Sequence, residues 1–296
     1  MTIRHTVQGI DSPETLQKAL RTAQYLADDD LATAVYLALV LGKPLLLEGA
    51  PGVGKTEVAK AVGSVLMRSL IRLQCFEGID ASAALYEWNY PRQILAIRQA
   101  EAEAGEEQSA EINIYSDRFL IERPLLRALN GGENALLLLD EIDRADHEFE
   151  AFLLEYLSDF QISIPETGVI RARKRPMVIL TSNRTRELHE ALRRRCVYHW
   201  IDYPDATREA EIVMARASAV AQDTARAIVA AVGRLRQEPL AKPPGIAETV
   251  EWAEAATVLN DLGSPWPEAF RRSIGVVLKD QDDLSFLENR LDALIA

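Results

Sequence analysis

One run of residues combines the amino-acid types that can hold nucleotide phosphates. Gly49, Gly54, Lys55 and Thr56 match the pattern G-x-x-x-x-G-K-[ST]. The glycines let successive backbone N–H groups point at phosphate oxygens, while the lysine supplies a cation and the threonine supplies a hydroxyl for Mg²⁺. The pattern therefore predicts binding of ATP with Mg²⁺. The residues expected to contact the nucleotide are Gly49, Ala50, Pro51, Gly52, Val53, Gly54, Lys55, Thr56 and Glu57.

Two adjacent carboxylates follow the apolar run 135–139. Asp140 and Glu141 would lie at the carboxyl end of a buried strand, the edge where open α/β sheets bind ligands. Asp140 suits Mg²⁺, which prefers one or two carboxylates together with substrate phosphates. Glu141 is placed to orient or deprotonate the attacking water. An acidic pair that only caps the following helix is the alternative, and the complete phosphate loop favours the catalytic interpretation.

Two further groups of polar residues accompany later apolar runs. Asn183 ends the run that begins at Met177, and it would contact the attacking water or the γ-phosphate, or only form a turn. Arg193, Arg194 and Arg195 precede the last apolar run. An arginine stabilises charge on a transferred phosphoryl group, in its own chain or from a partner. A solvated basic turn is the alternative for this cluster.

The elements expected around these residues alternate between strands and helices, which is typical of a parallel sheet covered on both faces. Apolar runs predict strands at 45–47, 71–75, 135–139, 177–180 and 197–201. Helical patterns occur at 12–26, 30–41, 55–67, 207–220, 223–236, 247–262, 267–278 and 280–295. We therefore expect three parts: a helical N-terminal lead (1–42), an α/β nucleotide-binding domain (43–204) and an all-helical domain (205–296).

Composition argues against several other classes of protein. The net charge of −12 disfavours a surface built mainly to hold nucleic acid or anionic lipid. Cys75 and Cys196 lack the spacing of a disulfide framework or a zinc site, and we expect both to be buried thiols in strands. No stretch reads as a secretory signal or as a membrane span. The expected location is the cytoplasm.

The four motifs, in this chain order and before a helical C-terminal part, resemble those of the AAA+ ATPases. Segments 73–80 (LQCFEGID), 85–91 (LYEWNYP) and 139–146 (LDEIDRAD) are similar to the MoxR type, and within it to the CoxD-like branch. This resemblance implies a core with a parallel five-stranded sheet of order 5-1-4-3-2 and a C-terminal helical lid. It further implies a ring, usually a hexamer, with ATP between subunits and a partner that carries a von Willebrand factor A domain. The implied client is a metal-containing enzyme, such as the molybdenum and copper carbon monoxide dehydrogenase.

Carried onto this chain, the resemblance also implies roles for individual residues. The loop 49–56 becomes Walker A, Asp140 and Glu141 become Walker B, and Asn183 becomes sensor 1. Arg194, with Arg195 next, becomes the finger that reaches a neighbouring subunit. Many related lids carry a sensor 2 arginine, but the corresponding stretch 245–250 reads GIAETV. Either another lid arginine, Arg271 or Arg272, contributes, or the lid is coupled to the nucleotide differently.

Three other segments stand outside the nucleotide motifs. Phe76, Tyr86, Trp88 and Tyr90 would either touch a client or anchor the core. Residues 159–172 predict a β-hairpin before sensor 1. The acidic stretch 101–111 predicts a solvated loop or an exposed helix end.

Three classes of function remain after these observations. The favoured one is an ATP-driven chaperone that remodels a client, a molybdenum hydroxylase for example, during maturation of a metal-containing enzyme. A second is a motor linked to nucleic acid, whose phosphates Arg171, Arg173, Lys174 and Arg175 would meet, although the acidic composition makes nucleic acid an unexpected partner. A third is a non-catalytic scaffold that binds nucleotide only to hold its ring together. A GTPase is disfavoured because no NKxD motif occurs.

Overall fold

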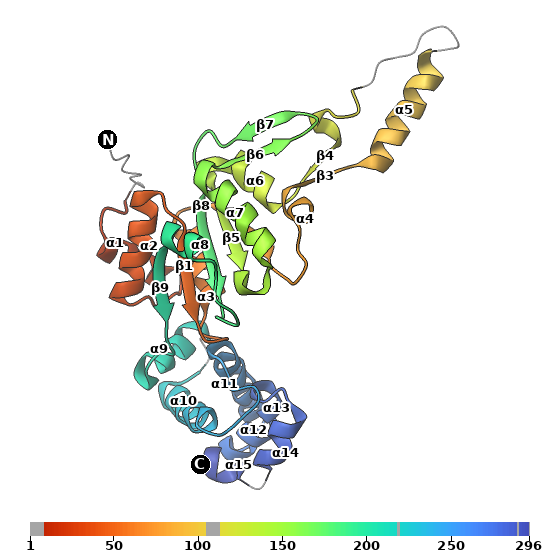
Figure 1. Cartoon of the computed structure of the whole chain (residues 1–296). Coiled ribbons are helices and arrows are strands. Elements are labelled where there is room, and N and C mark those ends of the chain that lie inside the picture. Colours follow the sequence, from red (N-terminus) through yellow and green to blue (C-terminus); the bar gives the residue numbers. More distant parts are fainter. Residues whose placement is uncertain (1–8, 105–112, 218–219, 289, 296) are drawn as a thin grey trace.

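A computed structural model describes residues 9–104, 113–217, 220–288 and 290–295. Figure 1 shows an α/β body, a helical C-terminal part below it and one helix, α5 (Tyr90–Ala104), that projects away from the body. An α/β body with a parallel sheet and a helical C-terminal region is the fold class predicted from the sequence.

The body is built on a five-stranded sheet with the order β2-β5-β8-β1-β9. All neighbouring strands are parallel. Counted along the chain and read from β9, this order is 5-1-4-3-2, as the resemblance implies. The carboxyl ends of β1, β5 and β8 therefore meet at one edge of the sheet. The strands are β1 (Leu45–Gly49), β2 (Ser69–Gln74), β5 (Ala135–Asp140), β8 (Met177–Ser182) and β9 (Val197–Ile201).

Helices cover both faces of the sheet because successive strand residues point to opposite sides. In β5, Leu136 and Leu138 pack with α1, α2 and α3, whereas Leu137 and Leu139 pack with α6 and α7. Each fully buried leucine contributes roughly 1.5–3 kcal/mol. The two N-terminal helices thus share one hydrophobic cluster with β1 and α3. These helices are α1 (Pro13–Thr22), α2 (Asp29–Leu41), α3 (Lys55–Val65), α6 (Pro124–Gly131), α7 (His147–Asp159) and α8 (Glu190–Arg195).

Small insertions extend the body at one end. The predicted hairpin is confirmed by β6 (Gln161–Ile164) and β7 (Gly168–Arg171), which pair antiparallel. A second pair, β3 and β4, flanks the projecting helix α5, which the apolar pattern of the sequence did not predict. Glu101 is exposed on α5, and residues 105–111 of the acidic stretch lie outside the described residues. The remaining short elements are α4 (Ala81–Leu85), β3 (Tyr86–Trp88), η1 (Asp117–Phe119), β4 (Leu120–Glu122), η2 (Gly132–Asn134) and η3 (Ile142–Arg144).

The C-terminal helices, which we call the lid, enclose a separate hydrophobic cluster around the buried Trp252. Two long helices predicted here are wrong, because each is divided. The helix expected at 267–278 breaks at Ser273, whose hydroxyl bonds back to the carbonyls of Ala269 and Phe270 and so competes with helix continuation. The helix expected at 280–295 ends first at Leu287. The lid consists of α9 (Ala206–Arg216), α10 (Gln222–Arg236), α11 (Ile246–Asp261), α12 (Trp266–Arg272), α13 (Ile274–Val277), α14 (Gln281–Leu287) and α15 (Leu291–Ile295).

Both cysteines lie beside strands and not within them. Cys75 follows β2 by one residue and is buried, whereas Cys196 precedes β9 and is partly buried. Burial raises the pKa of each thiol to about 12. Within the described ranges, no helix has the length and apolar character that a membrane span requires.

Candidate nucleotide site

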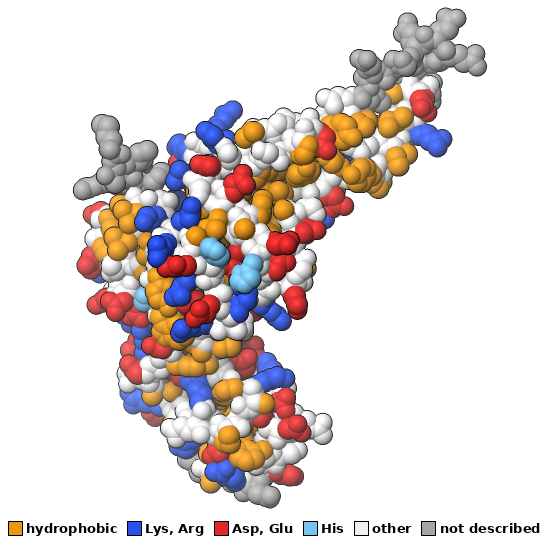
Figure 2. All heavy atoms as spheres, viewed as in Figure 1, with side chains coloured by type: hydrophobic (Ala, Val, Ile, Leu, Met, Phe, Trp, Pro, Cys, Tyr) orange, Lys and Arg blue, Asp and Glu red, His pale blue; other side chains and the backbone are white. Residues whose placement is uncertain are grey.

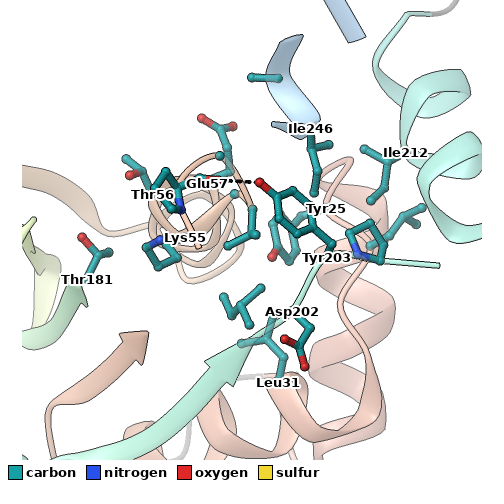
Figure 3. A pocket seen from close by; sticks show the side chains of 18 of the residues that line it. Tyr25, Leu31, Lys55, Thr56, Glu57, Thr181, Asp202, Tyr203, Ile212 and Ile246 are labelled. Carbon is teal, nitrogen blue, oxygen red and sulfur yellow. Dashed lines mark hydrogen bonds between the residues drawn. The ribbon is translucent and has the colours of Figure 1, made fainter. Parts of the chain in front are cut away.

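A pocket of about 660 Å³ lies where the sheet edge, the N-terminal helices and the lid meet. Its size is within the usual range for small-molecule sites. Figure 3 shows Lys55, Thr56 and Thr181 toward one end, with Tyr25, Tyr203 and Ile246 toward the other. We call one side the phosphate wall, formed by residues 51–57, Asp140, Glu141, Thr181 and Asn183. We call the opposite side the lid wall, formed by Arg208, Ile212, Arg216, Ile246, Ala247, Val250 and Glu251.

The phosphate loop connects β1 to α3 and needs glycine at its ends. A side chain on Gly49 would bring Cβ within 2.2 Å of the Ile201 carbonyl oxygen, because β9 runs directly alongside. Gly54 caps α3 with a φ of 92°, in the left-handed region that side chains other than glycine rarely adopt. The loop therefore ends with the first N–H groups of α3 free of a side-chain cap, as an anion site at a helix start requires.

Lys55 is buried and points back into the loop. Its Nζ donates to the carbonyls of Gly49, at 2.8 Å, and Ala50, at 2.7 Å. Burial lowers the pKa of this lysine to about 8, although the negative charges of Asp143 and Asp140 act to raise it. The ammonium group is therefore still mainly charged at neutral pH, and its present acceptors are main-chain oxygens that phosphate oxygens would replace.

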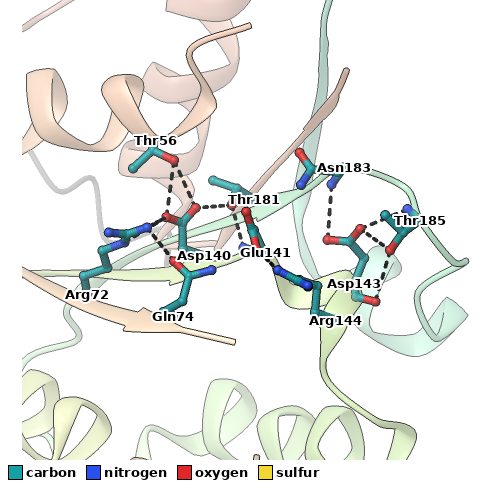
Figure 4. A network of polar contacts seen from close by, with 10 residues as sticks. All are labelled: Thr56, Arg72, Gln74, Asp140, Glu141, Asp143, Arg144, Thr181, Asn183 and Thr185. Carbon is teal, nitrogen blue, oxygen red and sulfur yellow. Dashed lines mark hydrogen bonds and ion pairs between the residues drawn. The ribbon is translucent and has the colours of Figure 1, made fainter. Parts of the chain in front are cut away.

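Asp140 is only 2% exposed and is the centre of a polar network (Figure 4). The Thr56 hydroxyl lies 3.1 and 3.3 Å from its two carboxylate oxygens, and the Thr181 hydroxyl donates to Oδ1 at 2.5 Å. The Thr56 hydroxyl and the Asp140 carboxylate fit a shared hydrated Mg²⁺, because both are hard oxygen donors beside the phosphate loop. Arg72 currently supplies the positive charge, with Nε and Nη2 at 2.8 and 2.6 Å from Oδ2.

Glu141 adopts a backbone conformation that is uncommon for a residue with a side chain. Its φ of 54° and ψ of 50° lie in the left-handed region, and such strain is often found at functional sites. Its N–H donates to the Thr181 hydroxyl at 2.9 Å, which fixes the turn after β5. The carboxylate is one-third exposed and pairs with Arg144 at 3.1 Å. The turn thus presents a carboxylate to the pocket next to Asp140.

Asn183 is held in place through its backbone by a buried carboxylate. Asp143 accepts hydrogen bonds from the N–H of Asn183 at 3.2 Å, and from the N–H and hydroxyl of Thr185 at 2.9 and 2.7 Å. Burial alone would raise the pKa of Asp143, but these donors hold it below its ordinary value. The loop after β8 is thereby fixed beside Glu141, with the Asn183 side chain lining the pocket.

The arginine cluster lies away from the pocket of its own chain. Arg193 approaches the buried Glu48 at 3.9 Å, and Arg195 donates to Ser158 at 3.1 Å. Among the described residues, the ion pair of Arg194 is with Glu190 on the same helix, and both side chains are 75% exposed. Of the described residues that line the pocket, none belongs to this cluster. Arg194 is therefore the member presented most openly to a neighbouring molecule.

The lid arginines that reach the pocket differ from those named as alternatives from the sequence. Arg271 and Arg272 lie on α12 and are not among the pocket-lining residues. Arg208 and Arg216, both on α9, line the pocket instead. Arg208 bonds to Asp28 at 3.0 Å, and Arg216 bonds to Glu57 at 2.6 Å. Both pairs fasten the lid to the body.

Arg72, Thr181 and Asp143 are the site residues that the sequence reasoning missed. The signal available for Arg72 was its strand position: Gln74 is in register with Asp140, and residues 72 and 74 share one face of β2. Thr181 similarly lies on β8, next to β5 in the sheet. Asp143 has no comparable signal, since its partners lie 40 and 42 residues away in a loop.

The aromatic and basic segments divide between core and surface. Trp88 is buried, whereas Phe76 and Tyr90 are exposed, so only some of the four aromatic residues act as core anchors. Figure 2 shows apolar side chains gathered along the projecting helix α5, where Ile94 and Leu95 are also exposed. The basic run is engaged within the chain through three contacts: Arg171 with Gln161, Lys174 with Glu133, and Arg175 with the Phe160 ring.

Comparison with known proteins places this geometry in context. Residues 44–196 match the family model for the AAA domain (dynein-related subfamily). The uncharacterized protein YojN of Bacillus subtilis is 31% identical over 202 residues, which cover 65% of this chain and 58% of YojN, less than two thirds of that relative. Protein NorQ of Paracoccus denitrificans is 27% identical over 219 residues, 72% of each chain. The structure of a mutant of Thermotoga maritima RuvB superposes with a TM-score of 0.52 at 17% identity, covering 98% of this chain and 79% of that one, a likeness of fold alone.

Proposed function

Because the chain belongs to the AAA domain family, in its dynein-related subfamily, we propose that it is a MoxR-type ATPase that uses ATP hydrolysis to remodel a client protein. Membership of the family implies a nucleotide-hydrolysing ATPase, and the likeness to NorQ supports the MoxR type. One observation carries the proposal: the phosphate loop, Asp140, Glu141 and Asn183 all line one pocket of suitable size.

Most residues of the phosphate wall have a proposed role. The loop N–H groups and Lys55 hold the β- and γ-phosphates, while Thr56 and Asp140 hold Mg²⁺. When bound, Mg²⁺ neutralises charge on the phosphate oxygens. Glu141 takes a proton from the attacking water, and Asn183 keeps that water in line. Binding of Mg²⁺ and nucleotide would break the ion pair between Arg72 and Asp140.

A neighbouring copy of the chain supplies the remaining positive charge. Arg194 is open to solvent and lies outside the pocket of its own chain. We propose that Arg194, with Arg195 beside it, reaches the γ-phosphate held by the next subunit of a homo-hexameric ring. Each interface then completes one site, so hydrolysis and assembly are coupled.

The identity of the client rests on the sequence resemblance. We propose a cytoplasmic ATPase that works with a von Willebrand factor A protein on a metal-containing enzyme, such as a molybdenum and copper carbon monoxide dehydrogenase. The exposed Phe76 and Tyr90 and the projecting helix α5 provide apolar surface for such a client. The proposed functional division is a lead (1–42), a nucleotide-binding domain (43–204) and a lid (205–296).

Replacement of Glu141 tests the enzymatic part of the proposal. Glu141→Gln should lower ATP hydrolysis about 100-fold or more, since it removes the general base, while nucleotide affinity stays within a few-fold of wild type. Glu148→Gln, at an exposed position on α7, is the matched control and should retain full turnover. Undiminished hydrolysis by Glu141→Gln would overturn the assignment. Proteins retained by this variant with ATP but not with ADP identify the client.

A further inference from the structure

Two neighbouring carbonyl groups of the phosphate loop are held from outside the loop. The carbonyl of Pro51 accepts a hydrogen bond from the Tyr203 hydroxyl at 2.9 Å. The carbonyl of Gly52 accepts one from the N–H of Ile246, also at 2.9 Å. Tyr203 lies between β9 and the lid, and Ile246 is the first residue of α11. The loop is thus bonded directly to the lid and to the segment that links β9 to the lid.

The start of α11 touches the loop so closely that side chains are excluded. A Cβ on Gly245 would lie 2.7 Å from the Gly52 Cα and 3.0 Å from the Gly52 carbonyl oxygen. A Cβ on Gly52 would lie 2.7 Å from the Gly245 Cα. Because both near atoms belong to the main chain, neither contact could be relieved by a side-chain rotation. The two glycines therefore form a main-chain contact between the phosphate loop and the lid.

A buried polar network fixes the lid half of this contact. The Thr249 hydroxyl oxygen lies 3.0 Å from the Gly245 carbonyl oxygen and 2.9 Å from Glu209 Oε1. Glu209 is 2% exposed and receives both terminal nitrogens of Arg236, at 2.7 and 2.8 Å. A buried carboxylate is stable only when it is paired and fully hydrogen-bonded, so this network has one favoured arrangement.

Arg236 connects the network to the second loop contact. Its guanidinium lies over the Tyr203 ring, 4.4 Å from the centroid, and its Nε donates to the carbonyl of Pro244 at 2.8 Å. The contacts therefore close into a circuit that begins at Gly52, passes through α11 and α10 and returns to Pro51. Neither Arg236 nor Thr249 is among the described residues that line the pocket, whereas Ile246 and Val250 of α11 are.

We propose that Arg236 is a positioning residue that couples the phosphate loop to the lid without touching the nucleotide. It holds Tyr203 and the start of α11 against two loop carbonyls. When phosphates enter the loop and its N–H groups turn inward, these carbonyls shift and carry the lid with them. Main-chain contacts thus perform in this chain the coupling that a lid arginine in stretch 245–250 would otherwise provide. The inference rests on the proposed nucleotide site but does not require hydrolysis.

The test measures lid movement separately from turnover. Labels on Lys18→Cys and Lys279→Cys, in a full-length chain whose native cysteines are replaced by serine, report the distance between α1 and the lid. We expect this distance to change when ADP saturates the protein. Gly245→Ala and Arg236→Gln should abolish most of that change even at saturating ADP. Gly233→Ala, a lid glycine whose added Cβ would meet no atom within 4 Å, should respond as the parent does.

Tyr203→Phe keeps the test decisive if the stronger variants fail to fold. It deletes one hydroxyl and leaves the ring over Arg236, and a single lost hydrogen bond corresponds to an about two- to tenfold effect. We expect a smaller ADP-dependent distance change, a melting temperature without nucleotide that is only a few degrees lower and an about threefold loss in ADP affinity. A full distance change in Tyr203→Phe or in Gly245→Ala, or none in the parent with ADP bound, would overturn the inference. Loss of hydrolysis alone would bear only on the proposed function.

Discussion

The phosphate wall and the lid wall of the pocket are built from different kinds of groups. The phosphate wall presents formal charges to the pocket, chiefly Lys55, Asp140 and Glu141. In the lid wall the arginines are already paired with carboxylates of the body, and next to it Gly245 and Gly52 are so close that neither has room for a side chain. Charges in the phosphate wall would bind the ligand, whereas contacts in the lid wall hold the lid to the body of the protein. Substitutions in the two walls should therefore have effects of different size and kind.

Lys55→Ala gives the largest difference between the walls. The lysine is buried, and its ammonium would form charge-assisted hydrogen bonds with phosphate oxygens, each worth about 1.5–3 kcal/mol. We expect ADP affinity to fall about 100-fold, measured by isothermal titration calorimetry. Lys18→Ala, at an exposed position on α1, should bind as wild type does. Near-normal ADP binding by Lys55→Ala would contradict the claim that charge in the phosphate wall holds the nucleotide.

The pH dependence of ADP binding comes next in size. The pKa of Lys55 is lowered to about 8 by burial, and phosphates would raise it again by favouring the charged form. Below pH 8 the lysine of the free protein is already charged. Above pH 8 it must take up a proton when ADP binds. Affinity should fall about tenfold between pH 7 and pH 9. Lys55→Met should lose this slope and retain only the titration of the nucleotide itself, so an equal slope in both proteins would exclude Lys55 as its source.

Arg72→Ala should have a smaller effect of opposite sign. Arg72 neutralises Asp140 at 2.6 Å and thus competes with a divalent cation for the same carboxylate. Its side chain is half exposed, so we expect an about fivefold tighter apparent affinity for Mn²⁺ in the presence of ADP. Electron paramagnetic resonance of free Mn²⁺ measures this directly, with Arg123→Ala as the control. Weaker Mn²⁺ binding would show that Arg72 supports the metal site.

Arg216→Ala should have the smallest effect on binding. Both side chains of its ion pair with Glu57 are about one-third exposed, and such pairs contribute about 0.2–1 kcal/mol. An about twofold change in ADP affinity is therefore expected. A loss comparable to that of Lys55→Ala would mean that Arg216 contacts the nucleotide, and the contrast between the walls would fail.

Most of the phosphate wall could be predicted from sequence because its chemistry resides in residue types at fixed spacing. Thr181 could not, because its hydrogen bond to Asp140 depends on the order of the strands in the sheet. Strands β1, β5, β8 and β9 were visible for a related reason, since each is a short apolar run. The lid wall has no such signal: Gly245 and Thr249 are ordinary residues whose importance arises from a fold that brings them to Gly52 and Glu209. The helix α5 was missed because its apolar residues do not form one buried face: Ile94 and Leu95 are exposed.

Mixing two inactive variants tests most directly whether neighbouring chains complete each other's sites. Arg194→Ala/Arg195→Ala chains keep Glu141 but lack the arginines, and Glu141→Gln chains keep the arginines but lack the base. Each variant alone should hydrolyse ATP very slowly. Their mixture should regain activity, because some interfaces then join an intact Glu141 to an intact Arg194. A mixture that forms joint oligomers but stays inactive, or an arginine variant that is fully active alone, would contradict a site shared between subunits.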